Sequence, residues 1–189
     1  MRNILTLGIL CLMGLFHTTN GQDLALKEPD FVGEGLLIND TQAVSLEKNK
    51  VNIETRMYWS AVGLNIVVNG CCSNVSTKAG TVKLLVKVQD NSLSPSSSIE
   101  VFRLNSNAKN RIVEYMKLGN FGRMKEGTKM ETLTFVGTKY GVSSYILTLQ
   151  DVKPGEYGLV LESEKKNVGG GGALKSVVGP TSILCFSVK

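Results

Sequence analysis

The chain has 189 residues, of which 42% are hydrophobic and 20% charged, and its formal net charge is +5. A length of this order suits one large domain or two small ones. Because the basic residues are spread along the chain rather than gathered with aromatics into a dense patch, we predict no binding to nucleic acid.

The first 21 residues have the pattern of a secretory signal peptide. Arg2 provides a positive start, and Ile4 to Phe16 form an apolar run that is too short for a comfortable transmembrane span. Cleavage is expected before Gln22, and a buried N-terminal helix is the alternative. No later segment is long and apolar enough to cross a bilayer. We therefore expect residues 22–189 to be exported, without a transmembrane anchor, to the periplasm, the cell surface or the outside of the cell.

The only histidine, His17, lies in this predicted signal. Its removal would leave no histidine for Ser-His-Asp or Cys-His nucleophile activation, or for the usual zinc sites. The acidic residues form no calcium-binding loop, and the glycine run at 169–172 lacks the Lys-Ser/Thr ending of a phosphate loop. We therefore predict no catalytic residue, no metal site and no cofactor.

Apolar and polar residues alternate with a period of two along most of the chain, which is typical of strands with one buried face. The expected strands are 31–38, 50–57, 61–68, 81–88, 98–104, 111–118, 132–137, 144–149, 157–161 and 184–188. The apolar residues of 111–118 could also line a helix face. Nine or ten short strands predict an all-β, antiparallel sandwich of the immunoglobulin-like type. It would form one domain in residues 22–189, or two small halves divided near 105–110.

Tyr58 and Trp59 are the only adjacent aromatic residues in the expected exported chain. On an exposed sheet face, such a pair could stack on the sugar rings of a glycan. Trp59 is also the only tryptophan, and at the head of a strand a tryptophan is more often part of the core.

Three cysteines, Cys71, Cys72 and Cys185, remain after the expected cleavage. If Asn69-Gly70 forms a two-residue hairpin turn, Val68 faces Cys71, so Cys71 points inward and Cys72 outward. Strand parity then favours a Cys72–Cys185 disulfide over a Cys71–Cys185 disulfide. We favour three unpaired thiols, at least one of them in the core, ahead of the Cys72–Cys185 bond. A ring between Cys71 and Cys72 is the third alternative.

The stretch VKPGEYGLVL, residues 152–161, is interpreted as a structural corner rather than a catalytic site. Pro154 and Gly155 suit a tight turn, and Tyr157 then begins a strand with alternating apolar residues. A tyrosine in this position can bury its ring while its hydroxyl binds nearby backbone, as in the tyrosine corner of immunoglobulin-like sandwiches. Glu156 has no visible partner for catalysis.

Several segments resemble uncharacterised exported proteins of Bacteroidetes. KYGVSSYILTL (139–149), PGEYGLVL (154–161) and ILCFSV (183–188) resemble their C-terminal parts, and EPDFVGEGLLIND (28–40) followed by VSLEK resembles their start after the signal. The resemblance spans most of the exported chain and implies export across the inner membrane and a β-sandwich. It transfers no catalytic residue, and the Cys71-Cys72 pair is not a feature of that group.

Taken together, these patterns predict a non-enzymatic exported β-sandwich that acts as a binding or structural module for an unknown protein or glycan. The first alternative is a carbohydrate-binding module that uses Tyr58 and Trp59. The second is a hydrolase that uses two carboxylates placed across a cleft, which would need no histidine.

Overall fold

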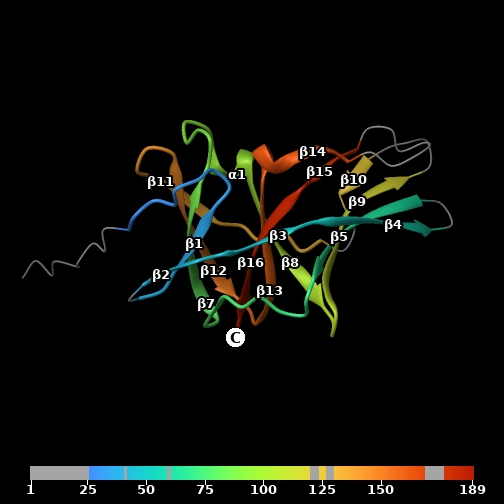
Figure 1. The fold of residues 1–189 in the computed structure, drawn as a ribbon, viewed down its shortest axis with the longest axis horizontal. Helices are drawn as coiled ribbons and strands as arrows, with labels where there is room; N and C mark the ends of the chain where they lie inside the picture. The colour runs from blue at the N-terminus through green and yellow to red at the C-terminus, as the bar shows by residue number, and fades with distance from the viewer. Residues whose placement is uncertain (1–25, 41, 59–60, 120–123, 127–129, 169–176) are drawn as a thin grey trace, which may run out of the picture.

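The structure is a computed structural model that describes residues 26–40, 42–58, 61–119, 124–126, 130–168 and 177–189. Two antiparallel sheets pack against each other as a sandwich (Figure 1). The predicted all-β antiparallel sandwich is therefore confirmed, while the immunoglobulin-like subtype stays a prediction. The predicted signal peptide, residues 1–21, lies outside the described residues.

The smaller sheet has five strands in the order β11-β12-β7-β1-β2. Their bounds are Val136–Tyr140 (β11), Ser144–Val152 (β12), Gly80–Lys87 (β7), Gly35–Ile38 (β1) and Ala43–Ser45 (β2). Neighbouring strands are antiparallel throughout.

The larger sheet follows the order β3-β16-β13-β8-β9-β5-β4. Its strands are Glu47–Lys50 (β3), Ser182–Val188 (β16), Gly155–Leu161 (β13), Ile99–Ser106 (β8), Asn110–Gly119 (β9), Ala61–Asn69 (β5) and Asn52–Tyr58 (β4). Two short strands join this sheet from the side: Met124–Glu126 (β10) pairs with β9, and Ser76–Thr77 (β6) runs parallel to β16.

A separate two-stranded ribbon consists of Lys165–Val168 (β14) and Val177–Pro180 (β15). Within the described residues, the helical segments are Pro95–Ser98 (α1) and the short 3₁₀ segment Glu162–Glu164 (η2). In the described part of the chain, no helix has the length and apolar character needed to span a bilayer.

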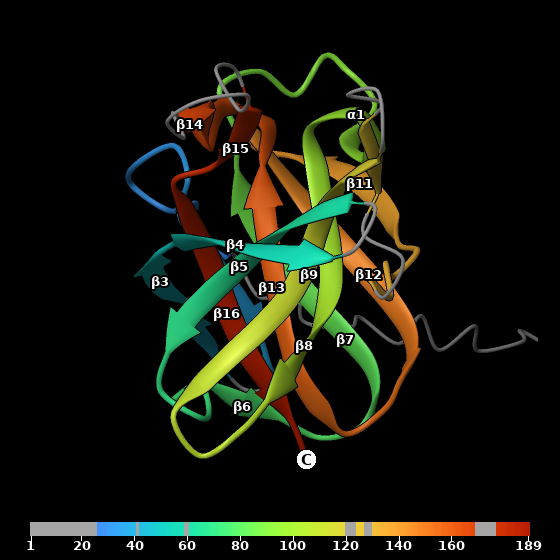
Figure 2. The same ribbon diagram turned by 90° about the vertical axis from the view of Figure 1, so that its right-hand side faces the viewer.

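The central strands β13 and β16 of the larger sheet are buried on both faces. On one face, alternate residues of β13 and β16 pack against the smaller sheet, in a core that includes Leu84, Leu147, Tyr157, Leu159, Leu184 and Phe186. On the other face, β5 and β9 cross over β13 and β16 (Figure 2), which buries a second core that includes Ile66, Phe102, Val113, Val160, Ile183 and Cys185. Strands buried on both faces are apolar at nearly every position, as the sequences of β13 and β16 are.

Segments on the two sides of residues 105–110 pair with each other in both sheets. β5 pairs with β9, and β7 pairs with β12. Both halves of the chain therefore contribute to the same two cores.

The segment 111–118 is a strand, and the alternative helix is wrong. It belongs to β9, which pairs with β5 along most of its length and with the end of β8. The expected strand at 132–137 is displaced: Thr132 forms an isolated bridge to Phe102, and β11 begins only at Val136. The expected strand at 31–38 begins at Gly35.

The corner at residues 154–157 has the geometry expected of a tyrosine corner. The Tyr157 side chain is buried, and its ring stacks on Phe186 at 5.4 Å between centroids. Its hydroxyl donates to the backbone oxygen of Lys153 at 2.7 Å. The Arg103 guanidinium donates to the backbone oxygen of Pro154 at 2.9 Å and so ties the corner to β8.

We predict that Tyr157→Phe destabilises the protein by about 1 kcal/mol, because it removes one intramolecular hydrogen bond while the ring packing is retained. Urea unfolding of both proteins measures the difference. An unchanged free energy of unfolding would show that the hydroxyl does not hold the corner.

Candidate functional site

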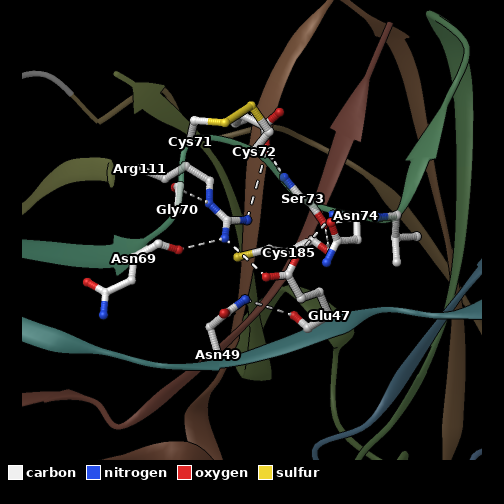
Figure 3. Close-up of polar contacts among 12 residues, drawn as sticks. Glu47, Asn49, Asn69, Gly70, Cys71, Cys72, Ser73, Asn74, Arg111 and Cys185 are labelled. Atoms are coloured by element: carbon white, nitrogen blue, oxygen red, sulfur yellow. Dashed lines mark hydrogen bonds and ion pairs between the residues drawn. A yellow bond between two sulfur atoms is a disulfide. The ribbon is translucent and has the colours of Figure 1, made fainter. Parts of the chain in front are cut away.

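The candidate site is built on the loop that leaves β5 at Asn69. Gly70 has a φ of +88°, a conformation that glycine adopts without a Cβ clash, and it turns the chain away from the sheet. The next two residues, Cys71 and Cys72, form a disulfide with each other (Figure 3). The Cys72 side chain is exposed and the Cys71 side chain is half-buried.

Two sequence-based expectations for the cysteines are wrong. Cys72 is not bonded to Cys185, which is a free cysteine within the second core. The three thiols are not all unpaired, since Cys71 and Cys72 are bonded to each other. The reason is local: Asn69-Gly70 is not a hairpin turn, because the chain continues through the loop to β6, which runs parallel to β16. No strand returns along β5 directly after Gly70, so strand parity does not set the direction of Cys71 and Cys72.

Arg111 of β9 binds the backbone of this loop, and its side chain is only 1% exposed. Its Nε donates to the backbone oxygen of Gly70 at 3.2 Å, and its Nη2 donates to that of Asn69, also at 3.2 Å. The same guanidinium forms ion pairs with Glu47 of β3 at 3.1 Å and with Glu156 of β13 at 4.0 Å. One buried cation thus connects the end of β5 to two other strands.

Glu47 extends the network to the far end of the loop. Its Oε2 accepts a hydrogen bond from the backbone N–H of Asn74 at 3.1 Å. Burial favours the neutral form of this carboxyl, but hydrogen bonds from Ser73, Asn49, Arg111 and the Asn74 backbone outweigh it. The pKa of Glu47 is therefore lowered from its usual value.

The sequence indicated no partner for Glu156, but in the structure both of its carboxylate oxygens accept hydrogen bonds. Its carboxylate accepts hydrogen bonds from the backbone N–H of Ser73 at 2.9 Å and from the Ser187 hydroxyl. The Ser73 hydroxyl in turn donates to the backbone oxygen of Cys185 at 3.2 Å. The segment after the disulfide is thereby fixed to β13 and β16.

Cys185 lies beneath this network as a buried, inert thiol. In Figure 3 the guanidinium of Arg111 is drawn between the disulfide and the Cys185 sulfur. Burial raises the pKa of Cys185 to about 12, although the nearby Arg111 charge opposes the shift. A thiol with this pKa is not a nucleophile at neutral pH.

An open pocket of about 530 Å³ lies beside the disulfide. Its wall contains hydroxyl, amide, carboxylate and cationic groups together with two apolar side chains. The lining residues are Cys72, Ser73, Arg103, Leu104, Asn105, Ser106, Gly155, Glu156, Ser187, Val188 and Lys189. Gly155 of the predicted corner therefore lies at the pocket.

No described contact places Tyr58 or Trp59 at this pocket. Tyr58 is the last residue of β4, but its side chain and the whole of Trp59 lie outside the described residues. Among the described side chains, no group of three His, Cys, Asp or Glu is placed to share a metal ion.

Sequence reasoning missed the residues that build the site, namely Arg111, Glu47 and Ser73. One signal was present: Arg111 is in phase with Val113 and Tyr115, which are both buried. A charged residue on the apolar face of a strand indicates a buried ion pair or a site. The partners, which lie on β3 and β13, carry no such signal.

Comparison with known proteins gives no relative: no protein-family model, curated protein or solved structure matches this chain. The resemblance to exported proteins of Bacteroidetes therefore stays a prediction.

We predict that Arg111→Met destabilises the protein by about 3 kcal/mol, because it leaves two largely buried carboxylates and two backbone oxygens without their cation. Chemical denaturation measures the loss. Arg103→Met is the matched control, since the Arg103–Glu131 pair is more exposed, and should cost about 1 kcal/mol or less. Equal losses for the two variants would contradict the role assigned to Arg111.

Proposed function

We propose that this chain is an exported, non-enzymatic β-sandwich module, of the immunoglobulin-like type, that binds its ligand in the pocket beside Cys71–Cys72. The observation that carries the proposal is the buried network beneath this pocket. Arg111 and Glu156 fix the loop that forms one wall, so the wall is ordered before any ligand arrives. Preorganisation of this kind reduces the entropy lost on binding.

The pocket has the size and chemistry of a site for a small polar ligand. Ligand sites commonly measure about 300–1,000 Å³. The exposed side chains of Asn105 and Ser106 offer both donors and acceptors, and Arg103 and Lys189 add cationic groups. This mixture supports a ligand rich in hydroxyl groups, such as a short glycan.

The lining also favours binding over hydrolysis. A glycosidase needs two carboxyl groups about 5–10 Å apart across the scissile bond. Among the side chains that line this pocket, Glu156 supplies one carboxylate. Its two oxygens already accept hydrogen bonds from Ser73 and Ser187.

Export is supported by the signal pattern of residues 1–21 and by the resemblance to exported proteins. A disulfide formed by Cys71 and Cys72 suits an oxidising compartment. Each of these features supports the same location.

We predict that the purified protein binds a subset of an immobilised oligosaccharide panel, and that Asn105→Ala weakens this binding about fivefold to tenfold. The loss corresponds to one ligand hydrogen bond. Asn52→Ala, on the exposed side of β4, is the matched control and should bind normally.

Two outcomes would overturn this proposal. Absence of binding to every oligosaccharide would exclude the proposed ligand class. Loss of binding in Trp59→Ala, with normal binding in Asn105→Ala, would move the site from the pocket to the aromatic pair.

A further inference from the structure

The Cys71–Cys72 disulfide contributes little to the stability of the fold. A disulfide stabilises a protein mainly by restricting the unfolded chain, and the effect grows with the length of the closed loop. This disulfide joins adjacent residues, so its ring encloses no other residue. It also links no two secondary-structure elements, whereas a bond from Cys72 to Cys185 would have linked the loop to β16. Stabilisation of the fold therefore does not account for a disulfide at this pocket.

The loop around the disulfide is held by contacts that do not pass through the sulfur atoms. Before the pair, Arg111 binds the backbone oxygens of Asn69 and Gly70. After the pair, the backbone N–H of Ser73 donates to Glu156. Within the pair, the backbone oxygen of Cys71 accepts from the Ser106 hydroxyl. Opening the disulfide would leave all of these contacts in place.

The two cysteines of the disulfide differ in their exposure to solvent. Cys72 is exposed and lines the open pocket, whereas Cys71 is half-buried. Thiol–disulfide exchange requires that a thiolate reach one sulfur, and exposed disulfides are generally the labile ones. Attack at Cys72 with departure of Cys71 is the sequence that this exposure favours.

The remaining thiol in the described part of the chain is excluded from the exchange. Cys185 is fully buried, and its raised pKa keeps it protonated at neutral pH. A protonated, enclosed thiol neither attacks the disulfide nor captures an opened cysteine. Among the cysteines that the structure describes, an opened pair can therefore close only on itself.

We propose that Cys71–Cys72 is a redox modification site that is reduced, in the folded protein, by an external dithiol such as that of a dithiol oxidoreductase. A thiolate of the reductant attacks Cys72 Sγ, the Cys71–Cys72 bond breaks, and Cys71 leaves as a thiolate that takes a proton. The second thiol of the reductant then displaces Cys72, which leaves with a proton. The protein gains two thiols, and the reductant is oxidised to its disulfide.

Because the two cysteines are adjacent, a dithiol reduces the pair more effectively than a monothiol does. After attack by a monothiol, Cys71 remains next to the mixed disulfide at Cys72 and expels the monothiol again. This intramolecular reaction has a high effective concentration. A dithiol resolves the mixed disulfide by an intramolecular reaction of its own.

The test is differential alkylation of the purified protein after incubation with dithiothreitol under native conditions. After removal of the reductant without air and alkylation of the folded protein near neutral pH, peptide mass spectrometry should find both Cys71 and Cys72 labelled and Cys185 unlabelled. Reduction should shift the thermal unfolding midpoint by no more than about 3 °C. Glutathione at the same thiol concentration should give at least about tenfold less labelling. Cys185→Ala is the matched control and should leave the labelling of the pair unchanged.

A second measurement identifies the attacked sulfur. In Cys71→Ser and Cys72→Ser, the remaining cysteine of the pair should react with an aromatic disulfide reagent, about tenfold faster at Cys72 than at Cys71. Circular dichroism establishes that both variants are folded. The dithiothreitol test on the wild-type protein does not depend on the folding of either variant.

Three results would overturn the proposal. The pair could resist dithiothreitol until the protein is denatured, or reduction could unfold the protein. Glutathione could also reduce it as completely as the dithiol does. None of these results bears on oligosaccharide binding, so failure here is distinguishable from failure of the proposed function.

Discussion

The ion pairs of one buried guanidinium organise this end of the sandwich. Arg111 is almost fully enclosed, yet it binds two backbone oxygens of the Cys71–Cys72 loop and two carboxylates from separate strands. A buried charge is costly unless it is paired and hydrogen-bonded. The arrangement therefore persists only while Glu47, Glu156 and the loop keep their positions. This mutual dependence ties an irregular loop to the strands around it.

The same ion pairs explain how the Cys71–Cys72 disulfide can lie beside an open pocket without loss of the fold. The disulfide lies between two anchored segments, one held by Arg111 and the other by Glu156 through Ser73. Cys72 lines the pocket, while the free thiol Cys185 is buried in the core. Structural stability comes from the two apolar cores and the ion pairs. Chemistry at the disulfide is thereby separated from the stability of the protein.

The sequence predicted the fold more completely than the site. Period-two alternation identified most long strands, because one buried face per strand is a local property of the sequence. Strand pairing is not local, so nothing indicated that β5 and β9 would cover the outer face of β13 and β16. The cysteine prediction failed for the same reason: it assumed a hairpin at Asn69-Gly70, whereas the chain leaves the sheet there. Arg111 was visible as a charge in phase with buried residues, but its partners are more than forty positions away from it in the chain.

Native-state amide hydrogen exchange tests the central role of this network most directly. The backbone N–H groups of Ser73 and Asn74 lie outside any strand, but they donate to Glu156 and Glu47. If Arg111 and its carboxylates fix the loop, these two amides should be protected to within about tenfold of the amides in β5 and β9. Exchange as fast as that of the exposed loop residue Ala108 would contradict this role of Arg111.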